Sequence, residues 1–185
     1  NMASVAALSV LDDGPRKAQE YLASRNVALV ILQHLPQTHL DGAILSRSDN
    51  VPVIGMTLRY DRVDYFWFCL MHELAHLVRH LDKGLATAFF DDLSIAPMDL
   101  EKEADELATD TLIPPKVWAS SAARADPTAL NVCSLANTIG RSPAIVAGRV
   151  RHETKNFRLL THFVGQGMVR KHFGDQWISK EQGRS

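Results

Sequence analysis

An apolar run from Val63 to Leu81 contains neither proline nor glycine and carries the pattern H-E-x-x-H at its centre. A run of this length and composition predicts one long, largely buried helix. On a helix, side chains four residues apart lie on one face, so His72 and His76 can converge on one metal ion. Glu73 then lies beside that ion, where its carboxylate can take a proton from water. The alternative is a buried helix that carries two histidines and a glutamate by chance.

A catalytic zinc ion takes three protein ligands and keeps one open position. Residues 100–112 predict a second helix that is rich in acids and ends before two prolines. At about 100° per residue, one stripe of this helix contains two alanines, which permit close approach to the first helix. The members of that stripe are Glu101, Ala104, Asp105, Ala108 and Leu112. We therefore expect Glu101 as the third ligand and Asp105 as the hydrogen-bond partner of a ligating histidine.

Other residues could take the third ligand position instead, and Glu101 could be an ordinary surface acid. Asp91 and Asp92 are the main rivals, because the sequence does not determine the path of the loop that carries them. Glu103 is expected on the opposite, solvent-facing stripe of the acidic helix, and His80 is expected to miss the ion. Asp99 is a further acidic candidate for the third ligand. Cys69 is expected to be a small core residue.

Three short apolar stretches precede the metal helix, at residues 27–34, 40–45 and 51–60. They predict a small antiparallel sheet packed on the helix, and the first of them predicts a buried strand. The fold class is therefore α+β. After residue 112 the pattern predicts a short helix at most over 116–123 and helices over 127–139 and 143–153. Ser142 is expected to cap the last of these, with Pro143 in its first turn.

The composition is that of a globular chain of 185 residues with a net charge of −1. No apolar run is long enough to cross a membrane, and no secretory signal is visible at the N-terminus. Two cysteines do not form a disulfide framework, so we expect reduced thiols and a cytoplasmic protein.

The charge is unevenly distributed along the chain. Residues 1–123 carry 10 Lys and Arg against 17 Asp and Glu, whereas residues 124–185 carry 10 against 4. The basic third can indicate contact with nucleic acid or an acidic partner, and it can equally be a solvated face of an ordinary helical region.

Four sequence features together resemble the ImmA/IrrE family of metallopeptidases. Residues 40–43 and 52–54 are similar to its strand pair, and Phe68 to His76 is similar to its F-T-L-A-H-E-L-G-H core. Glu101 to Ala108 resembles its E-x-E-A-N-x-F-A helix, in which Asp105 replaces the usual Asn. Residues 112–114 resemble the L-M-P end of that helix. The resemblance spans about residues 27–115.

This resemblance implies a zincin-like fold, a zinc ion on His72, His76 and Glu101, and Glu73 as the catalytic base. It implies a metallopeptidase domain over residues 1–123, a helix-turn-helix-like pair packed on it over 124–160, and a tail over 161–185. Members of the family cleave helix-turn-helix transcription repressors in mobile-element and stress-response circuits. Others are fused to a DNA-binding module in regulators or antitoxins. Residues 57–62 are more similar to the fused type, which implies a DNA-binding part before residue 1.

Three functions therefore remain open at the level of the sequence. The first is a zinc endopeptidase that cuts a repressor, in which a strand of residues 40–45 or 51–60 pairs with the substrate. The second is a metal-bearing sensor or interaction domain with little turnover, favoured by the bulky residues near the motif. The third is a DNA-binding domain. The donor that would stabilise the transition state is undecided among Tyr60, Tyr65, Arg149 and His152.

Overall fold

The computed structural model describes residues 1–32, 41–46, 49, 51–82 and 98–174. Within them the helices are α1 (Met2–Ala7), α2 (Gly14–Ala23), α3 (Val63–Asp82), α4 (Met98–Leu112), α5 (Pro115–Ala119), α6 (Ala122–Ala125), α7 (Ala129–Ile139) and α8 (Pro143–Thr154). The strands are β1 (Ala28–Leu32), β2 (Gly42–Ser46) and β3 (Pro52–Thr57), and three short 3-10 turns are η1 (Leu8–Val10), η2 (Thr161–Phe163) and η3 (Arg170–His172). The architecture is α+β, as expected.

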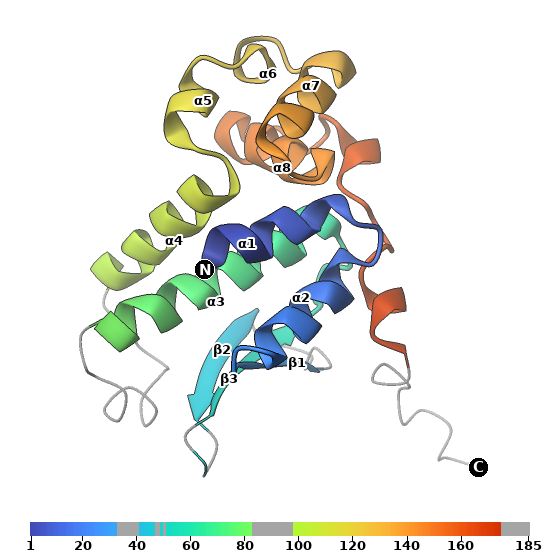
Figure 1. Cartoon of the computed structure of the whole chain (residues 1–185). Helices are drawn as coiled ribbons and strands as arrows, with labels where there is room; N and C mark the ends of the chain where they lie inside the picture. The colour runs from blue at the N-terminus through green and yellow to red at the C-terminus, as the bar shows by residue number, and fades with distance from the viewer. Residues whose placement is uncertain (33–40, 47–48, 50, 83–97, 175–185) are drawn as a thin grey trace.

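Helix α3 lies at the centre of the molecule, with the sheet and α2 on one side and α7 and α8 on the other (Figure 1). It covers the predicted run and ends one residue later, at Asp82. Phe66, Trp67, Leu70 and Met71 are fully buried, because the run is apolar almost all round. The helix that carries the motif is therefore the structural axis of the fold.

Helix α4 runs alongside α3, on the left of the view (Figure 1). Its side chains Ala104, Ala108 and Leu112 are buried. This is the stripe that the helical periodicity predicted, and the small side chains bring the two helix axes close together. Glu103 is exposed on the other side, also as predicted.

The three strands form a mixed sheet in the order β1-β3-β2, so the expected antiparallel sheet is wrong in one of its two pairings. Strand β2 pairs with β3 antiparallel, and β1 pairs with β3 parallel. The third strand lies between the first two. Nothing local in the sequence reports this order, because strand pairing joins residues that are distant in the chain.

The first strand is half-buried rather than buried. Leu29 and Ile31 face the core, whereas Val30 and Leu32 are 40% and 43% exposed on the other face of the sheet. The apolar run predicted burial on both faces, but alternate residues of a strand point to opposite faces of the sheet. The described part also ends at Leu32, so the expected extension to His34 lies outside it.

The helix α1 was not predicted from the sequence. It buries Val5 and Ala6, and Asn1 caps it by accepting a hydrogen bond from Ala3 N at 3.0 Å. Just after it, Ser9 Oγ accepts a hydrogen bond from Ser142 N at 3.1 Å. A run of six residues is too short for its periodicity to identify a helix, and tertiary packing stabilises it here.

The junction between α7 and α8 follows the predicted capping chemistry. Gly140 has φ 62° in the left-handed region that ends α7, and Ser142 Oγ accepts a hydrogen bond from Ala144 N at the start of α8. The first residues of α8, at 144–147, are all buried. A recognition helix reads bases with its N-terminal residues, so α8 cannot act in this way in the observed fold.

One hydrophobic core runs from Val5 to Phe173 and includes residues of the sheet, of α3 and of α7 and α8. The segments expected over 1–123 and 124–160 share this core. A close crossing joins them, because a Cβ on Gly148 of α8 would lie 2.8 Å from the Cβ of Asp64 on α3. In the described part of the chain, no helix has the length and apolar character needed to span a membrane.

Candidate metal centre

The side chains of His72, His76 and Glu101 meet between α3 and α4. The Nε2 atoms of the two histidines are 3.0 Å apart. The Glu101 carboxylate reaches them both, with 3.2 Å from Oε2 to His72 Nε2 and 3.3 Å from Oε1 to His76 Nε2. Among the described residues, this is the only group of His, Cys, Asp and Glu whose donor atoms gather within 4.8 Å of one another.

The distances among the two Nε2 atoms and the two oxygens of Glu101 are close to those between neighbouring ligands of a tetrahedral metal site. With metal–ligand bonds of about 2.0–2.1 Å, neighbouring ligands of a tetrahedral ion lie about 3.3 Å apart. The three observed distances of 3.0, 3.2 and 3.3 Å are close to that value. Two imidazoles and one carboxylate are ligands of the kind that zinc accepts, so the residues present fit a divalent metal ion.

Asp105 lies one turn after Glu101 and reaches the outer nitrogen of His72. The distance from His72 Nδ1 to Asp105 Oδ1 is 2.9 Å, so an Nδ1–H donates to this carboxylate. That tautomer leaves a lone pair on Nε2, which points at Glu101 and His76. The structure thus places Asp105 where the periodicity of α4 expects it. The carboxylate also makes the imidazole a stronger ligand.

Glu73 is buried beside this cluster, with 8% of its surface exposed. Burial raises the pKa of its carboxyl to about 7, with Glu101 adding to the rise and His72 opposing it. A carboxyl that titrates near neutrality is suited to accept a proton and return it. This raised pKa of Glu73 applies to the metal-free protein.

Gly42, the first residue of β2, packs directly on the Glu73 side chain. A Cβ at this position would lie 2.4 Å from Glu73 Oε1 and 2.7 Å from its Cδ. Only glycine leaves room for the carboxylate here, so the edge strand and the Glu73 side chain are in contact. Gly42 belongs to residues 40–43, which resemble the family's strand pair, but the sequence did not predict its contact with Glu73.

The rival ligands are placed elsewhere or are not described. Glu103 is exposed and lies 3.9 Å from Arg79 Nε, and Asp99 is exposed in the first turn of α4. Asp91 and Asp92 lie outside the described residues, as does the side chain of His80. Cys69 is buried, as expected, and burial raises the pKa of its thiol.

A chain of polar groups on α3 leads from Glu73 toward the start of β2. Tyr65 and Cys69 precede Glu73 by two turns and one turn, so the three share a face of the helix. Burial chiefly raises the pKa of the Tyr65 hydroxyl, and the neighbouring Cys69 and a hydrogen bond with Asp41 raise it further. Tyr65 is therefore a neutral hydrogen-bond donor directed at the β2 side of the site.

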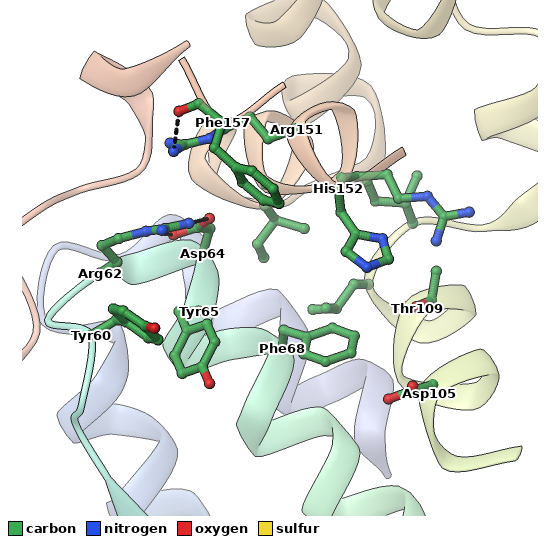
Figure 2. Close-up of a pocket in the computed structure, with 15 residues that line it drawn as sticks. Tyr60, Arg62, Asp64, Tyr65, Phe68, Asp105, Thr109, Arg151, His152 and Phe157 are labelled. Atoms are coloured by element: carbon green, nitrogen blue, oxygen red, sulfur yellow. Dashed lines mark hydrogen bonds and ion pairs between the residues drawn. The ribbon is translucent and has the colours of Figure 1, made fainter. Parts of the chain in front are cut away.

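A pocket of about 560 Å³ opens beside the metal centre, between α3, α4 and α8 (Figure 2). Asp105 and Phe68 form its edge nearest the centre, and the Phe68 ring lies 6.2 Å from the His72 ring. Its far end holds the ion pair of Arg62 with Asp64. No pattern in the sequence indicated this pocket, because its walls come from three helices and two loops.

All four candidate transition-state donors line this pocket. Tyr60 stacks edge-on with Tyr65, with ring centroids 4.9 Å apart. Arg149 lies over the Trp118 ring, 5.6 Å from its centroid, and is drawn toward Glu153. The His152 ring hangs from α8 into the pocket, above Thr109 (Figure 2). Burial, Lys155 and Arg149 lower the pKa of His152, so its imidazole is neutral at pH 7.

Comparisons with known proteins give little further information. No protein-family model matches the chain, and no curated protein matches it. One solved structure with a detectable likeness is described as a Mycobacterium tuberculosis transcriptional regulator. It has 18% sequence identity and a TM-score of 0.43 over 76% of this chain, and the match spans only 40% of that protein's chain.

Proposed function

We propose that this protein is a zinc-dependent endopeptidase whose substrate is a helix-turn-helix transcription repressor. The observation that carries the proposal is the convergence of His72, His76 and Glu101 on one point, with the buried carboxyl of Glu73 beside it. The repressor as substrate rests on the resemblance to the ImmA/IrrE family alone. The finer description of the fold as zincin-like belongs to the same proposal.

His72, His76 and Glu101 would hold the ion, which would supply a Lewis acid to polarise the peptide carbonyl and acidify the attacking water. Glu73 takes the proton of that water and delivers it to the leaving amine. His72 is held in the required tautomer by Asp105 at 2.9 Å. Burial of Glu73 keeps bulk water from its carboxylate, so the proton passes between few groups.

The peptide would bind along β2, which is the outer strand in the order β1-β3-β2. An extended segment can pair with such an edge through backbone hydrogen bonds. Because Gly42 of this strand touches Glu73, a paired peptide would pass the base at close range. Of the two strands considered from the sequence, β3 is paired on both sides, so β2 is the one that offers an edge.

The test is a comparison of host cells that express the wild type with cells that express Glu73→Gln. The variant is expected to bind one zinc ion and keep its fold, because the amide has the shape of the carboxylate but cannot accept the proton. New protein N-termini, measured by mass spectrometry, should appear with the wild type only. A terminus inside a DNA-binding regulator would identify the substrate.

The alternative is a metal-binding sensor or interaction domain of a regulator or antitoxin. Its support is the bulky surroundings of the motif: the Phe68 ring lies 6.2 Å from the His72 ring, whereas Phe66, Trp67 and Met71 are buried in the core. No new termini in either strain, with zinc bound in both and the partner still captured by both, would favour this alternative. Metal analysis of the purified protein decides between zinc and manganese or iron.

A further inference from the structure

We propose that the pocket between α3, α4 and α8 binds a small monocarboxylic acid with an apolar body, which is held through the buried guanidinium of Arg151. None of His72, His76 and Glu101 lines this pocket, so the site is separate from the metal centre. The acid would be an effector of the protein rather than the reactant at the ion, and the proposal holds whether or not the protein cuts peptides.

Arg151 is a buried cation whose hydrogen bonds are incomplete. It lines the pocket from α8 and is 6% exposed. Its Nη2 donates to the Phe157 carbonyl at 2.6 Å, while its Nε and Nη1 are buried and have no hydrogen-bond partner in the described part of the chain. A buried guanidinium needs acceptors for its five N–H groups, because the loss of hydration is otherwise uncompensated. The unused donors indicate an acceptor that the described residues do not supply.

The other two arginines of the pocket lie close to carboxylates. Arg62 donates to both oxygens of Asp64, and Arg149 Nε lies 3.6 Å from Glu153 Oε2. Arg151, in contrast, forms no ion pair with any residue that the structure describes. One positive charge in the wall of the pocket is therefore left without an opposite charge, and a bound monoanion would neutralise it.

The Arg151 guanidinium lies at the same end of the pocket as the ion pair of Arg62 with Asp64 (Figure 2). Burial lowers the pKa of Arg151, and the charge of Arg62 lowers it further, with Asp64 opposing. Two guanidiniums thus share one carboxylate at this end. An arginine binds a carboxylate best through two parallel N–H donors, so the head of the ligand would complete the set. A dianion such as a phosphate would add a second negative charge next to Asp64, which disfavours it.

The remaining walls of the pocket suit an apolar body. Leu112 and Ile113 line it from the end of α4, Ile145 from α8, and Phe68 from α3. The volume of about 560 Å³ is within the range of roughly 300–1,000 Å³ that is typical of small-ligand sites. Phe157 lines the pocket beside Arg151 and is 56% exposed, so its side chain has room to move as a ligand enters. The walls and the single charge together specify a monocarboxylate with an apolar chain or ring.

The first test compares two probes that differ in the charge of the head, 4-phenylbutanoate and 4-phenylbutanamide. Their affinities for the purified protein are measured by NMR titration, followed on the methyl signals of Ile113 and Ile145 in the pocket wall. The carboxylate is expected to bind about 10–100-fold more tightly, because hydrogen bonds between charged groups are the stronger ones. Equal affinities would overturn the proposal, and this comparison needs no variant that could fail to fold.

Two further comparisons test the body and the head of the ligand. Hexanoate should bind about 15-fold more tightly than butanoate, since each buried methylene strengthens binding about fourfold. 4-Phenylbutyl phosphate, measured at about pH 8 where it is a dianion, should bind more weakly than 4-phenylbutanoate. Equal affinities of hexanoate and butanoate, or tighter binding of the phosphate, would overturn the apolar monocarboxylate as the ligand class.

Arg151→Met removes the charge and keeps an apolar stem at the same position. In this variant 4-phenylbutanoate should bind no more tightly than the amide. Arg158→Met is the matched control, because Arg158 is exposed, carries the same charge and is not part of the pocket wall. It should retain the difference between the two probes. A difference of the wild-type size in Arg151→Met would overturn Arg151 as the residue that holds the carboxylate.

Thr109→Phe introduces an aromatic ring into the pocket from α4. This variant should no longer bind 4-phenylbutanoate, because the ring takes the space of the ligand's apolar body. Lys102→Phe adds the same ring to the same helix, at a side chain that is 76% exposed, and should bind the probe as the wild type does. An unchanged affinity in Thr109→Phe would place the ligand outside this pocket.

A carboxylate can also bind to a zinc ion, so the titrations are run on zinc-loaded protein and on protein treated with a chelator. Equal affinity of 4-phenylbutanoate for the two forms is expected, because the pocket does not include the metal ligands. Binding that requires zinc would overturn the pocket as the site and would leave the peptidase proposal standing. Conversely, an absence of new N-termini in host cells would count against the peptidase and leave the affinities of the pocket unchanged.

Discussion

The two ends of the site are built in different ways. At the metal end, His72 and His76 come from α3 and Glu101 comes from α4, and the spacing of residues along each helix sets the geometry. At the pocket end, the walls come from α3, α4, α8 and the loops around Tyr60 and Phe157. The metal end is thus defined by local periodicity and one helix pair, whereas the pocket depends on how the C-terminal helices pack onto α3. Changes at one end should leave the other intact, and the predictions below concern the metal end.

Loss of a ligand should have the largest effect. Glu101→Ala removes the only carboxylate of the triangle, so the zinc affinity should fall by more than the about 10–100-fold that loss of a supporting hydrogen bond produces. Glu103→Ala, two residues along the same helix and exposed, should leave the affinity unchanged. Competition with a fluorescent chelator measures both. Equal affinities of the two variants would remove Glu101 from the site.

The stability of the metal-free protein should fall as the pH rises through the titration of Glu73. Its folded-state pKa of about 7 lies above the ordinary 4.5, so the folded state binds the proton more tightly than the unfolded state does. The protein is then most stable below pH 4.5 with respect to this group, and loses about 3 kcal/mol between pH 4.5 and 7. Urea unfolding should show about 2 kcal/mol of this loss between pH 5.5 and pH 8. In Glu73→Gln the corresponding decline should be absent.

Removal of the hydrogen bond to His72 should have a smaller effect than removal of a ligand. Asp105→Ala should lower the zinc affinity by about 10–100-fold, because the imidazole is no longer held in its tautomer. Asp105→Asn keeps an oxygen acceptor and should cost less than Asp105→Ala. If Asp105→Ala and Asp105→Asn bind zinc with equal affinity, the oxygen acceptor at this position does not contribute to the zinc affinity.

The contact of β2 with the Glu73 side chain should be sensitive to a single added methyl group at Gly42. Gly42→Ala places a Cβ within 2.4 Å of Glu73 Oε1, so the free energy of unfolding should fall by about 1–3 kcal/mol. Gly55→Ala on β3 meets its nearest atom, Leu32 Cδ1, at 3.3 Å and should cost clearly less. Thermal unfolding of the two variants measures the difference. If Gly42→Ala is as stable as the wild type, β2 does not pack closely on the Glu73 side chain.

Much of the metal end could be predicted from the sequence. The helix over residues 63–81, the acidic helix and the stripe with Glu101 and Asp105 were all expected, and the structure places these side chains together. Helical periodicity repeats over many residues, so the face on which a side chain lies follows from counting. The expected cap at Ser142 was confirmed for the same reason, since capping is local chemistry.

Other features could not be predicted. The antiparallel sheet was wrong for β1, which runs parallel to β3, and the burial of β1 was overestimated. The N-terminal helix α1 was missed because six residues carry too little periodicity. The bulky residues around the motif were expected to surround the site, whereas Phe66 and Trp67 pack from α3 into the core.

The sequence by itself determined that the long helices form, where α8 is capped and which helix faces carry the candidate ligands, because these depend on residues within a few turns of one another. Only the tertiary structure decided the strand order, the contact of Gly42 with Glu73 and the apolar pocket beside Asp105. Each of these joins residues far apart in the chain, and the free energy that selects them comes from burial summed over the whole core.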